Sequence, residues 1–581
     1  MKNSWRIKLA ALSCALGLAS SGLAAERLLA QTELELEQGR ATAQLWGDEL
    51  NNGYAQNLLV LLKDSRGRLL TAYAPSIKGG YSALLEAVQV KPIGTEAEVR
   101  AAVSPVAEVV DLGGRTVTPA FSDTHMHLLS YVGSKREVDL SAVHSVEELI
   151  AACRAALAAG QLANGWLMGR AWNQNGWSVP RIPDRHDLDQ ISREVPIALS
   201  RACYHVICIN TRAIELLGLS AACDGVLRED ECSCLSAIET EPTADALESM
   251  IQEGCGDLLK NGIACVHTDD FGDAGHYEPV YSAYRRLAET GKLPVRIVQQ
   301  CRFGEPEKLK QFLADGRFYG ETHGHYRLGE HKLLLDGSLG ARTSYMRKPY
   351  ADDPSTQGIP LFTEESLYEL TRISHAAGFP IAAHAIGDGA IEMLLNTVAR
   401  LQAESPRPDP RHGVVHCQIT DEAQLKRIAQ LGMQAYVQPI FVRADQHITE
   451  ARVGAQLAKT SYAWKTLLGL GINISGGSDC PVEPFDLLPN LACAVTRTDP
   501  TMPGAKPWHP EQCLSVEEAV RAFTQGAAYA SFEEDERGTL SVGKVADFAV
   551  LSRDIFTINP NEIGSTKVEM TVVDGEIAWE K

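Results

Sequence analysis

The chain has 581 residues, of which 45% are hydrophobic and 22% are charged, and its formal net charge is −20 at pH 7. This composition is that of a globular protein with a large core, and it argues against a disordered, collagen-like or polytopic membrane protein. No block of Lys and Arg supplies the basic surface that nucleic-acid binding requires, so we expect no nucleic-acid partner.

Residues 1–25 have the pattern of a secretory signal peptide. Lys2, Arg6 and Lys8 form a basic segment, the stretch Leu9–Leu23 is apolar or small, and residues 22–24 resemble a cleavage site. The apolar stretch is shorter than the roughly 20 residues of a membrane span. We therefore expect an exported protein, periplasmic or secreted, that has no stable membrane insertion after signal cleavage.

The cysteines allow two interpretations. Most of the 14 cysteines lie singly in apolar runs, which is typical of small buried side chains. Cys223, Cys232 and Cys234 lie together in a loop-like stretch, where a disulfide is plausible because an exported protein meets an oxidising environment. A zinc site made of cysteines alone is less expected, because the paired C-x₂-C pattern is missing.

The chain changes its pattern at about residue 117. Residues 26–116 hold short apolar runs and glycine turns, which indicate mostly strands with some helix. After them, short apolar runs alternate with amphipathic stretches such as Val146–Ala159, Ala244–Asn261 and Thr363–Ala377, which indicates a parallel sheet with crossover helices. The candidate strands are VTPAFSD, GWLMGR, PIALSRA, ACVHTD, VRIVQQ, HKLLLDG, PIAAHAIGD, GVVHCQ, QAYVQP and NISGGSD. An eight-stranded barrel would leave at least two of these ten outside it.

The C-terminal stretch Gly538–Trp579 again reads as strands, with a hairpin signal at Val573–Glu576. We therefore predict an α/β protein in which a (β/α)₈ TIM-like barrel is inserted in a small composite β-sandwich built from both chain ends. The predicted division is a signal peptide at 1–25, the N-terminal part of the sandwich at 26–116, the barrel at 117–510, and a C-terminal helix with the rest of the sandwich at 511–581.

Metal-competent side chains follow several predicted strands. His125 and His127 follow VTPAFSD, and residues i and i+2 of a strand point the same way. His384, His416 and Asp479 end three later apolar runs. The C-terminal ends of barrel strands carry the active site of such folds. Imidazole with carboxylate suits zinc or a similar first-row metal, so the set predicts a metal site.

Lys332 lies in HKLLLDGSLGAR, on an apolar strand that would point into the barrel. Two interpretations stay open. The ammonium could pair with a buried acid such as Asp336. Alternatively, burial could remove its proton, and a neutral lysine beside a metal pair can react with CO₂ to give a carbamate.

These residues occur in an order, H-x-H, Lys, His, His, Asp, that resembles the binuclear amidohydrolase superfamily. The local sequences resemble its family 3, the YtcJ-like and N-substituted formamide deformylase-like group, from about residue 110 to 551. The matching stretches are VDLGGRTVTPAFSDTHMH, RACYHVICIN, KLLLDGSLGARTSYM, AAHAIGDGAIEML, VVHCQI, GGSDCPVEPFDLL and GTLSVGKVADFAVLS.

The resemblance implies one or two divalent ions, zinc first among them. His125, His127 and Asp479 would bind one ion, and His384 and His416 the other. Lys332, carboxylated by CO₂, would bridge the two. Water, whose pKa the cations would lower, would become a hydroxide that attacks the substrate carbonyl, and Asp479 would act as general base and then as general acid toward the leaving amine.

The same resemblance gives roles to residues between the ligands. Arg201 and His205 match a motif of the family's second strand, and would orient substrate or stabilise the oxyanion. The alternative for both is structural hydrogen bonding. One of His267, Asp269 and Asp270, which follow the apolar run 263–266, would line the pocket.

The predicted activity is hydrolysis of a C–N bond other than a peptide bond, in a small amide, formamide or cyclic amide. Three alternatives stay open. The first is another reaction of the same barrel, such as ester hydrolysis, deamination or a lyase reaction. The second is a catalytically silent ligand-binding protein, and the third is an enzyme with one metal and an uncarboxylated Lys332. The oligomeric state is open, with a homo-oligomer among the expectations.

Overall fold

The computed structural model describes residues 112, 115–238, 242–272, 277–499, 502 and 504–581. Of the preceding part it describes the backbone of strands between residues 27 and 111. The predicted signal peptide at 1–25 lies outside the described residues.

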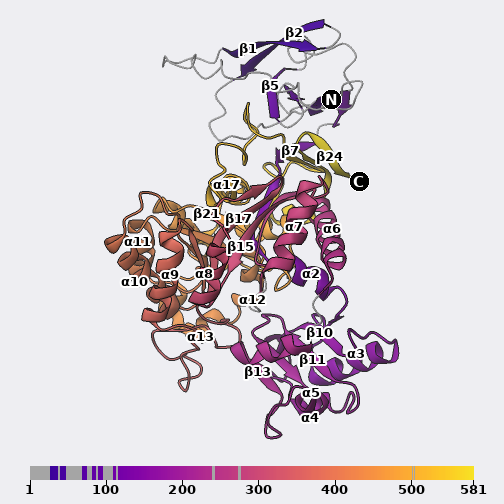
Figure 1. Ribbon diagram of the computed structural model, residues 1–581, viewed down its shortest axis with the longest axis vertical. Coiled ribbons are helices and arrows are strands. Elements are labelled where there is room, and N and C mark those ends of the chain that lie inside the picture. Colours follow the sequence, from indigo (N-terminus) through magenta and orange to yellow (C-terminus); the bar gives the residue numbers. More distant parts are fainter. Residues whose placement is uncertain are drawn as a thin grey trace.

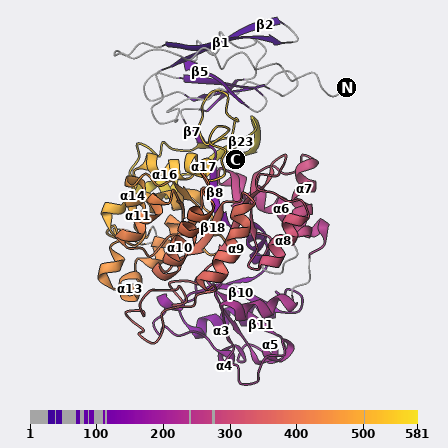
Figure 2. The same ribbon diagram turned by 60° about the vertical axis from the view of Figure 1, so that its left-hand side comes forward.

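A barrel of parallel strands forms the centre of the protein (Figures 1 and 2). Within the described residues, eight strands follow one another around it in chain order. They are β8 (Phe121–Met126), β14 (Ile263–Thr268), β15 (Arg296–Arg302), β17 (Tyr326–Leu334), β18 (Ile381–Ala385), β19 (Gly413–His416), β20 (Gln434–Val437) and β21 (Ile474–Gly476). Their side chains are almost all buried, as expected for parallel strands covered on both faces.

Side-chain and loop hydrogen bonds close the barrel between its first and last strands. The Thr124 hydroxyl on β8 donates to the Gly476 carbonyl oxygen on β21 over 3.0 Å. Beyond the end of β21, the Asp479 amide donates to the His125 carbonyl oxygen over 2.7 Å. These bonds place the loop after β21 directly against His125 at the end of β8.

Helices cover the outside of the barrel, and they start where the sequence places capping residues. Thr363, for example, forms a capping box with Ser366 at the start of α9 (Glu364–Ala376). The predicted helices at 146–159, 244–261 and 363–377 are all present, within one residue at each end. The other helices around the barrel are α6 (Ala244–Lys260), α7 (Glu278–Glu289), α8 (Pro306–Ala314), α10 (Asp388–Glu404), α11 (Glu422–Gln430), α14 (Trp464–Gly469), α15 (Leu487–Thr496), α16 (Val516–Ala522) and α17 (Gln525–Ala530).

Two of the ten predicted strands, GWLMGR and PIALSRA, lie outside the barrel. They form β10 (Leu167–Trp172) and β11 (Ile197–Arg201) in a separate mixed sheet. Its residues fall between β8 and α6 in the sequence, and it lies below the barrel in Figure 1. With β9 (Val138–Asp139), β12 (Val206–Ile209) and β13 (Val226–Arg228), and with α3 (Val146–Ala158), α4 (Arg185–Leu188) and α5 (Thr211–Leu216), they make an inserted subdomain. It has a hydrophobic core of its own around Trp172 and Leu199.

The motif RACYHVICIN therefore belongs to the inserted subdomain, and its predicted place on the second barrel strand is wrong. The second barrel strand is β14. A short apolar run looks the same in a barrel strand and in a strand of an added sheet, so the sequence pattern could not separate them.

Both chain ends contribute to one antiparallel sheet, as predicted. β7 (Thr116–Pro119) pairs with β22 (Phe548–Leu551), which continues into β23 (Val568–Val573) and β24 (Glu576–Glu580). The β23–β24 hairpin turns at Asp574 and Gly575, whose φ angles are 51° and 75°, as in a type I′ turn. The described N-terminal strands form two further sheets. One pairs β1 (Arg27–Leu36) with β2 (Gly39–Gly47). The other has the strand order β5 (Gln89–Thr95), β4 (Tyr81–Glu86), β3 (Leu69–Ala74) and β6 (Val109–Asp111).

The cysteines in the described part of the chain are all free thiols. Cys223, Cys232 and Cys234, for which a disulfide was considered, are free thiols that pack against one small apolar cluster of the inserted subdomain.

Among the described residues, no helix has the length and hydropathy needed to cross a membrane.

Candidate active site

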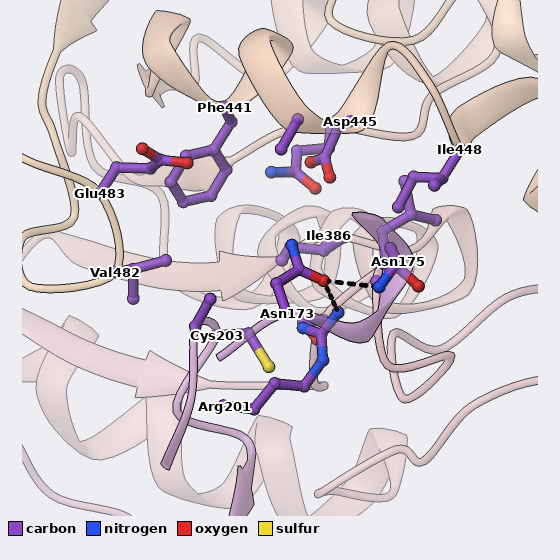
Figure 3. A pocket seen from close by; sticks show the side chains of 16 residues that line it. Asn173, Asn175, Arg201, Cys203, Ile386, Phe441, Asp445, Ile448, Val482 and Glu483 are labelled. Atoms are coloured by element: carbon purple, nitrogen blue, oxygen red, sulfur yellow. Dashed lines mark hydrogen bonds between the residues drawn. The ribbon is translucent and has the colours of Figure 1, made fainter. Parts of the chain in front are cut away.

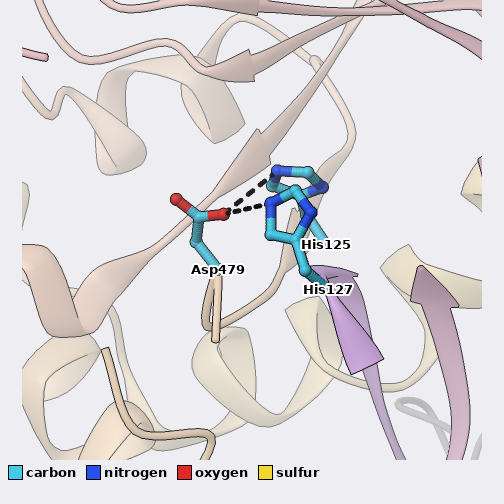
Figure 4. A group of neighbouring side chains, drawn as sticks. All are labelled: His125, His127 and Asp479. Atoms are coloured by element: carbon cyan, nitrogen blue, oxygen red, sulfur yellow. Dashed lines mark ion pairs between the residues drawn. The ribbon is translucent and has the colours of Figure 1, made fainter. Parts of the chain in front are cut away.

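His125 near the end of β8, His127 just beyond that strand and Asp479 after β21 converge at the C-terminal end of the barrel (Figure 4). The Nε2 atoms of His125 and His127 both lie 3.2 Å from the same oxygen, Oδ1 of Asp479. His125 is fixed by Gln300, whose side-chain oxygen lies 2.8 Å from the His125 Nδ1 atom. The predicted H-x-H pair is thus brought together with Asp479 in a geometry that could hold a metal ion.

The loop before Asp479 approaches β8 closely enough to exclude side chains. A Cβ atom on Gly477 would lie 2.8 Å from the His125 backbone nitrogen, so only glycine fits there. Burial alone would raise the pKa of Asp479, but its hydrogen bonds with His125 and His127 hold it well below the usual value. The aspartate therefore remains an anion at the position that faces both imidazoles.

His384 on β18 and His416 on β19 complete the cluster. Their ring centroids lie 4.4 Å apart, and the His416 ring lies 5.5 Å from that of His125. Nδ1 of His416 lies 2.8 Å from the side-chain oxygen of Gln438. Nε2 of His416 is buried and has no hydrogen-bond partner among the described residues. A nitrogen left in this state points to a ligand that the protein chain does not supply.

Burial keeps most of these imidazoles neutral. It lowers the pKa of His125, and it lowers those of His384 and His416 well below the ordinary value. His127 differs, since its hydrogen bond with Asp479 outweighs burial and raises its pKa. Metal ligands must be deprotonated, so neutral histidines beside an ionised carboxylate fit a divalent cation.

Lys332 on β17 is fully buried, and its ammonium nitrogen has no hydrogen bond within the described part of the chain. It lies 3.6 Å from Oδ2 of Asp269, not beside Asp336 as one interpretation had it. Asp336 instead accepts hydrogen bonds from the backbone amides of residues 345, 386 and 387. Burial, with the charge of Arg302, lowers the pKa of Lys332.

Of the three polar residues after the run 263–266, Asp269 is the one beside the site. Asp270 accepts hydrogen bonds from the Leu129 amide and the Tyr284 hydroxyl, and His267 lies 3.3 Å from Glu330 inside the barrel. Asp269 contacts Lys332 and stands against His127.

His205 and Arg201, both from the inserted subdomain, lie at the C-terminal end of the barrel. The ring of His205 lies 5.4 Å from that of His384, and its Nδ1 atom lies 2.7 Å from Oε2 of Glu229. Burial would lower the pKa of His205, but the charge of Glu229 raises it to about 9. Sequence reasoning missed Glu229, because only the pairing of β12 with β13 brings it next to His205.

A cavity adjoins these residues (Figure 3). It lies between the inserted subdomain, which contributes Arg201 and Cys203, and the loops that follow β17 to β21. Phe441, which stacks on His416, is part of its lining, and so are Asp445 and Glu483 on the wall opposite Arg201. Sequence reasoning gave no role to these last three residues: Glu483 lies in the matching stretch GGSDCPVEPFDLL without being singled out, and the segment with Phe441 and Asp445 has no distinctive pattern.

A sequence profile of the amidohydrolase family matches residues 108–578. The chain belongs to the amidohydrolase family. It is 31% identical over 495 residues to YtcJ of Bacillus subtilis, covering 82% of this chain and 92% of that protein. It is 26% identical over 525 residues to the N-substituted formamide deformylase of Arthrobacter pascens, covering 84% and 93% of the two chains.

The fold of this amidohydrolase is shared with solved structures. An uncharacterized metal-dependent hydrolase from Pyrococcus horikoshii superposes with a TM-score of 0.67 at 27% identity, covering 82% of this chain and 95% of that one. A second one, from Pyrococcus furiosus, gives a TM-score of 0.65 at 29% identity over 82% and 96% of the two chains. This protein is therefore similar to metal-dependent hydrolases along most of its length.

Proposed function

We propose that this amidohydrolase is an exported metal-dependent enzyme that hydrolyses a C–N bond other than a peptide bond in a small amide, formamide or cyclic amide. The observation that carries the proposal is the convergence of His125 and His127 on one oxygen of Asp479, 3.2 Å from each. The similarity to an N-substituted formamide deformylase supports a C–N bond as the target.

The donor set suits zinc or another divalent first-row cation. We assign His125, His127 and Asp479 to one ion, and His384 and His416 to a second. When bound, such ions supply a Lewis acid for the substrate carbonyl and lower the pKa of water.

Lys332 joins the two groups of ligands if it is carboxylated. Burial favours its neutral amine. The amine nitrogen would form a bond to the carbon of CO₂ and release one proton, which leaves a carbamate with two acceptor oxygens. The buried cation beside Asp269 would thereby become an anionic ligand.

The protein's own residues would move the protons. Asp479 is held as an anion, so it can take a proton from water and return it to the departing nitrogen. His205 is oriented through Nδ1 by Glu229, which leaves Nε2 to donate to the carbonyl oxygen as negative charge develops there. Arg201 would orient the substrate from the cavity wall.

The test combines elemental analysis with a substrate panel, on protein purified without chelators. About two zinc-like ions per chain, with turnover of a formamide, an acyclic amide or a cyclic amide, is the expected result. Faster turnover of the matching ester than of every amide would replace the C–N assignment. No metal and no turnover, after zinc and bicarbonate are supplied, would refute the enzyme and favour a silent binding protein.

Export is proposed from residues 1–25 alone. The test is mass spectrometry of the mature protein from its native host, fractionated by compartment. An N-terminus near residue 26 in the exported fraction is expected, and an intact N-terminus in the cytosolic fraction would refute export.

A further inference from the structure

Tyr462 lies behind the loops that surround His416, and its polar groups contact three different segments of the chain. The side chain is only 2% exposed, and the φ angle of the residue, 52°, is in the left-handed region. A residue other than glycine keeps such a backbone only where its surroundings fix it, and these residues cluster at functional sites. The segments that Tyr462 contacts therefore indicate what its conformation serves.

The backbone amide of Tyr462 holds the turn that follows His416. His416 and the residue after it both have left-handed φ angles, 72° and 49°. The next residue, Gln418, accepts a hydrogen bond from the Tyr462 amide over 2.8 Å. Between the same two segments, the hydroxyls of Thr420 and Thr460 each donate to the carbonyl oxygen of the other residue. The turn that ends β19 is thus fastened directly to the segment of Tyr462.

The hydroxyl of the same tyrosine holds a second segment that contacts His416, residues 438–445. At the start of this segment, the side-chain oxygen of Gln438 lies 2.8 Å from Nδ1 of His416. Phe441 stacks on the His416 ring, with 5.8 Å between the ring centroids. At the end of the segment, Asp445 accepts a hydrogen bond from the tyrosine hydroxyl. Figure 3 shows Phe441 and Asp445 on the same side of the cavity.

The charges of the pair favour this hydroxyl bond. Burial, together with the charge of Asp445, raises the pKa of Tyr462 well above its usual value, so the hydroxyl keeps its proton and donates. Burial also raises the pKa of Asp445, to about 6, which leaves the carboxylate ionised at neutral pH. A hydrogen bond to an ionised acceptor is stronger than one between neutral groups.

A buried cation fixes the carbonyl group of Tyr462. Arg497 is fully buried, and its Nη1 atom donates to the Tyr462 carbonyl oxygen over 2.9 Å. Its Nε atom donates to the Trp508 carbonyl oxygen over 2.7 Å. The guanidinium also lies over the rings of Trp464 and Trp508, 4.4 and 5.0 Å from their centroids. These contacts of Arg497 keep Tyr462 in its left-handed conformation.

From these contacts we infer that Tyr462 is a positioning residue for His416: it fixes both the turn that carries this histidine and the segment that contacts its ring, so that Nε2 is held in place for a cation. The inference rests on the proposed assignment of a second cation to His384 and His416. Removal of groups that orient a metal ligand usually weakens metal binding or activity roughly 10- to 100-fold.

Tyr462→Phe tests the inference, because it removes the hydroxyl and keeps the ring and the backbone contacts. Zinc binding to the full chain is measured by titration calorimetry after removal of its metal, with elemental analysis of the zinc bound per chain. We expect two ions in the unsubstituted chain. In the variant, one ion should bind about 10-fold more weakly and the other as before. Unchanged affinity for both ions would overturn the inference.

Tyr277→Phe is the matched control for the loss of a hydrogen bond. Tyr277 is 7% exposed, and its hydroxyl donates to Asp315 over 2.7 Å, between the start of α7 and the end of α8. Both variants should lower the melting temperature of the cation-free protein by a similar amount, because each loses one tyrosine–aspartate bond. Only Tyr462→Phe should weaken zinc binding. Equal weakening in both variants would assign the effect to general destabilisation and refute the positioning role.

A double-mutant cycle shows whether the hydroxyl acts through Asp445. Asp445→Ala should weaken the same ion as Tyr462→Phe, and the double variant should be little weaker than Asp445→Ala alone, because the two residues share one interaction. Fully additive losses would overturn the inference, since the hydroxyl would then act by another route.

The outcomes separate this inference from the proposed function. Selective weakening of one ion by Tyr462→Phe, without turnover of any amide by the unsubstituted chain, would contradict the proposed function and uphold the role of Tyr462. Turnover of amides, with zinc affinities that Tyr462→Phe leaves unchanged, would uphold the function and refute that role. A single bound ion in the unsubstituted chain would refute the second cation and the inference together.

Discussion

Two groups of buried histidines differ in what their ring nitrogens contact. His375 lies in the last turn of α9 and His412 directly precedes β19, and Nδ1 of His375 is 2.9 Å from Nε2 of His412. The remaining nitrogens contact the backbone, Nε2 of His375 at the Ser405 carbonyl oxygen and Nδ1 of His412 at the Ile381 amide, over 2.8 and 3.0 Å. At the barrel end, His416 leaves Nε2 without a partner among the described residues, and His125 and His127 share one oxygen.

The partners of the ring nitrogens distinguish buried histidines that stabilise the fold from buried histidines that can bind a ligand. A chain of hydrogen bonds that uses all four nitrogens leaves nothing for a ligand, so His375 and His412 are structural. Nitrogens that converge without protein donors or acceptors carry a desolvation cost that a bound cation would remove. We therefore expect the first group to govern stability and the second to govern activity.

Removal of divalent cations is the largest perturbation of the barrel-end group. A chelator should abolish hydrolysis and lower the melting temperature, because a cation present at 1,000 times its Kd stabilises the fold by about 4 kcal/mol. Thermal unfolding and turnover are measured before chelation, after it, and after zinc is added back. If neither changes, the histidines at the barrel end are as structural as the other pair.

Substitution of one barrel-end ligand should separate activity from stability. His416→Asn should lower kcat/KM on the order of 100-fold or more and reduce the metal content. The cation-free protein should keep its stability within about 1 kcal/mol, since Nε2 has no hydrogen bond to lose and the Asn amide can take the place of Nδ1 beside Gln438. A large fall in cation-free stability with unchanged turnover would reverse the comparison.

The corresponding change in the other group should have the opposite effect. His412→Leu removes the partner of His375 and of the Ile381 amide, and buried groups left unpaired cost about 1–3 kcal/mol. Chemical denaturation should show this loss, while kcat per folded molecule is unchanged. His412→Gln, which keeps a donor and an acceptor, is the milder control, and a loss of metal from either variant would contradict the assignment.

The smallest expected effect is the change in folding stability with pH that arises from His375 and His412. Burial lowers the pKa of both His375 and His412 below the usual value of 6.5, so below that pH the unfolded chain binds more protons than the folded one. Their contribution to stability is therefore complete above pH 6.5 and is lost as the pH falls. Denaturation of zinc-loaded protein between pH 5 and 8 should give a flatter profile for His412→Leu than for the unsubstituted chain. Parallel profiles would contradict this account.

Strands, helices and most metal-ligand candidates could be predicted because they depend on local properties. The eight barrel strands are all among the ten apolar runs, and each helix named in advance has its apolar residues at helical spacing. His384 and His416 end such runs, so the direction of a parallel strand was enough to place them at one end of the barrel.

The partners of these residues depended on the tertiary structure. Lys332 could have paired with Asp336, which lies two residues beyond the end of the same strand, but the barrel places Asp269, from the end of β14, beside it and gives Asp336 three backbone amides. The strand carrying Arg201 has the same apolar pattern as a barrel strand, yet it belongs to the inserted sheet, and only the packing of that sheet over the barrel brings Arg201 to the cavity.

The sequence by itself thus determined the family, the barrel and the identity of the side chains that could bind metal, because residue type and periodicity are properties of short segments. The tertiary structure alone decided that Glu229 orients His205 and that Asp445 stands on the cavity wall opposite Arg201. Those facts relate residues far apart in the chain, and they exist only once strands, inserted sheet and loops have packed together.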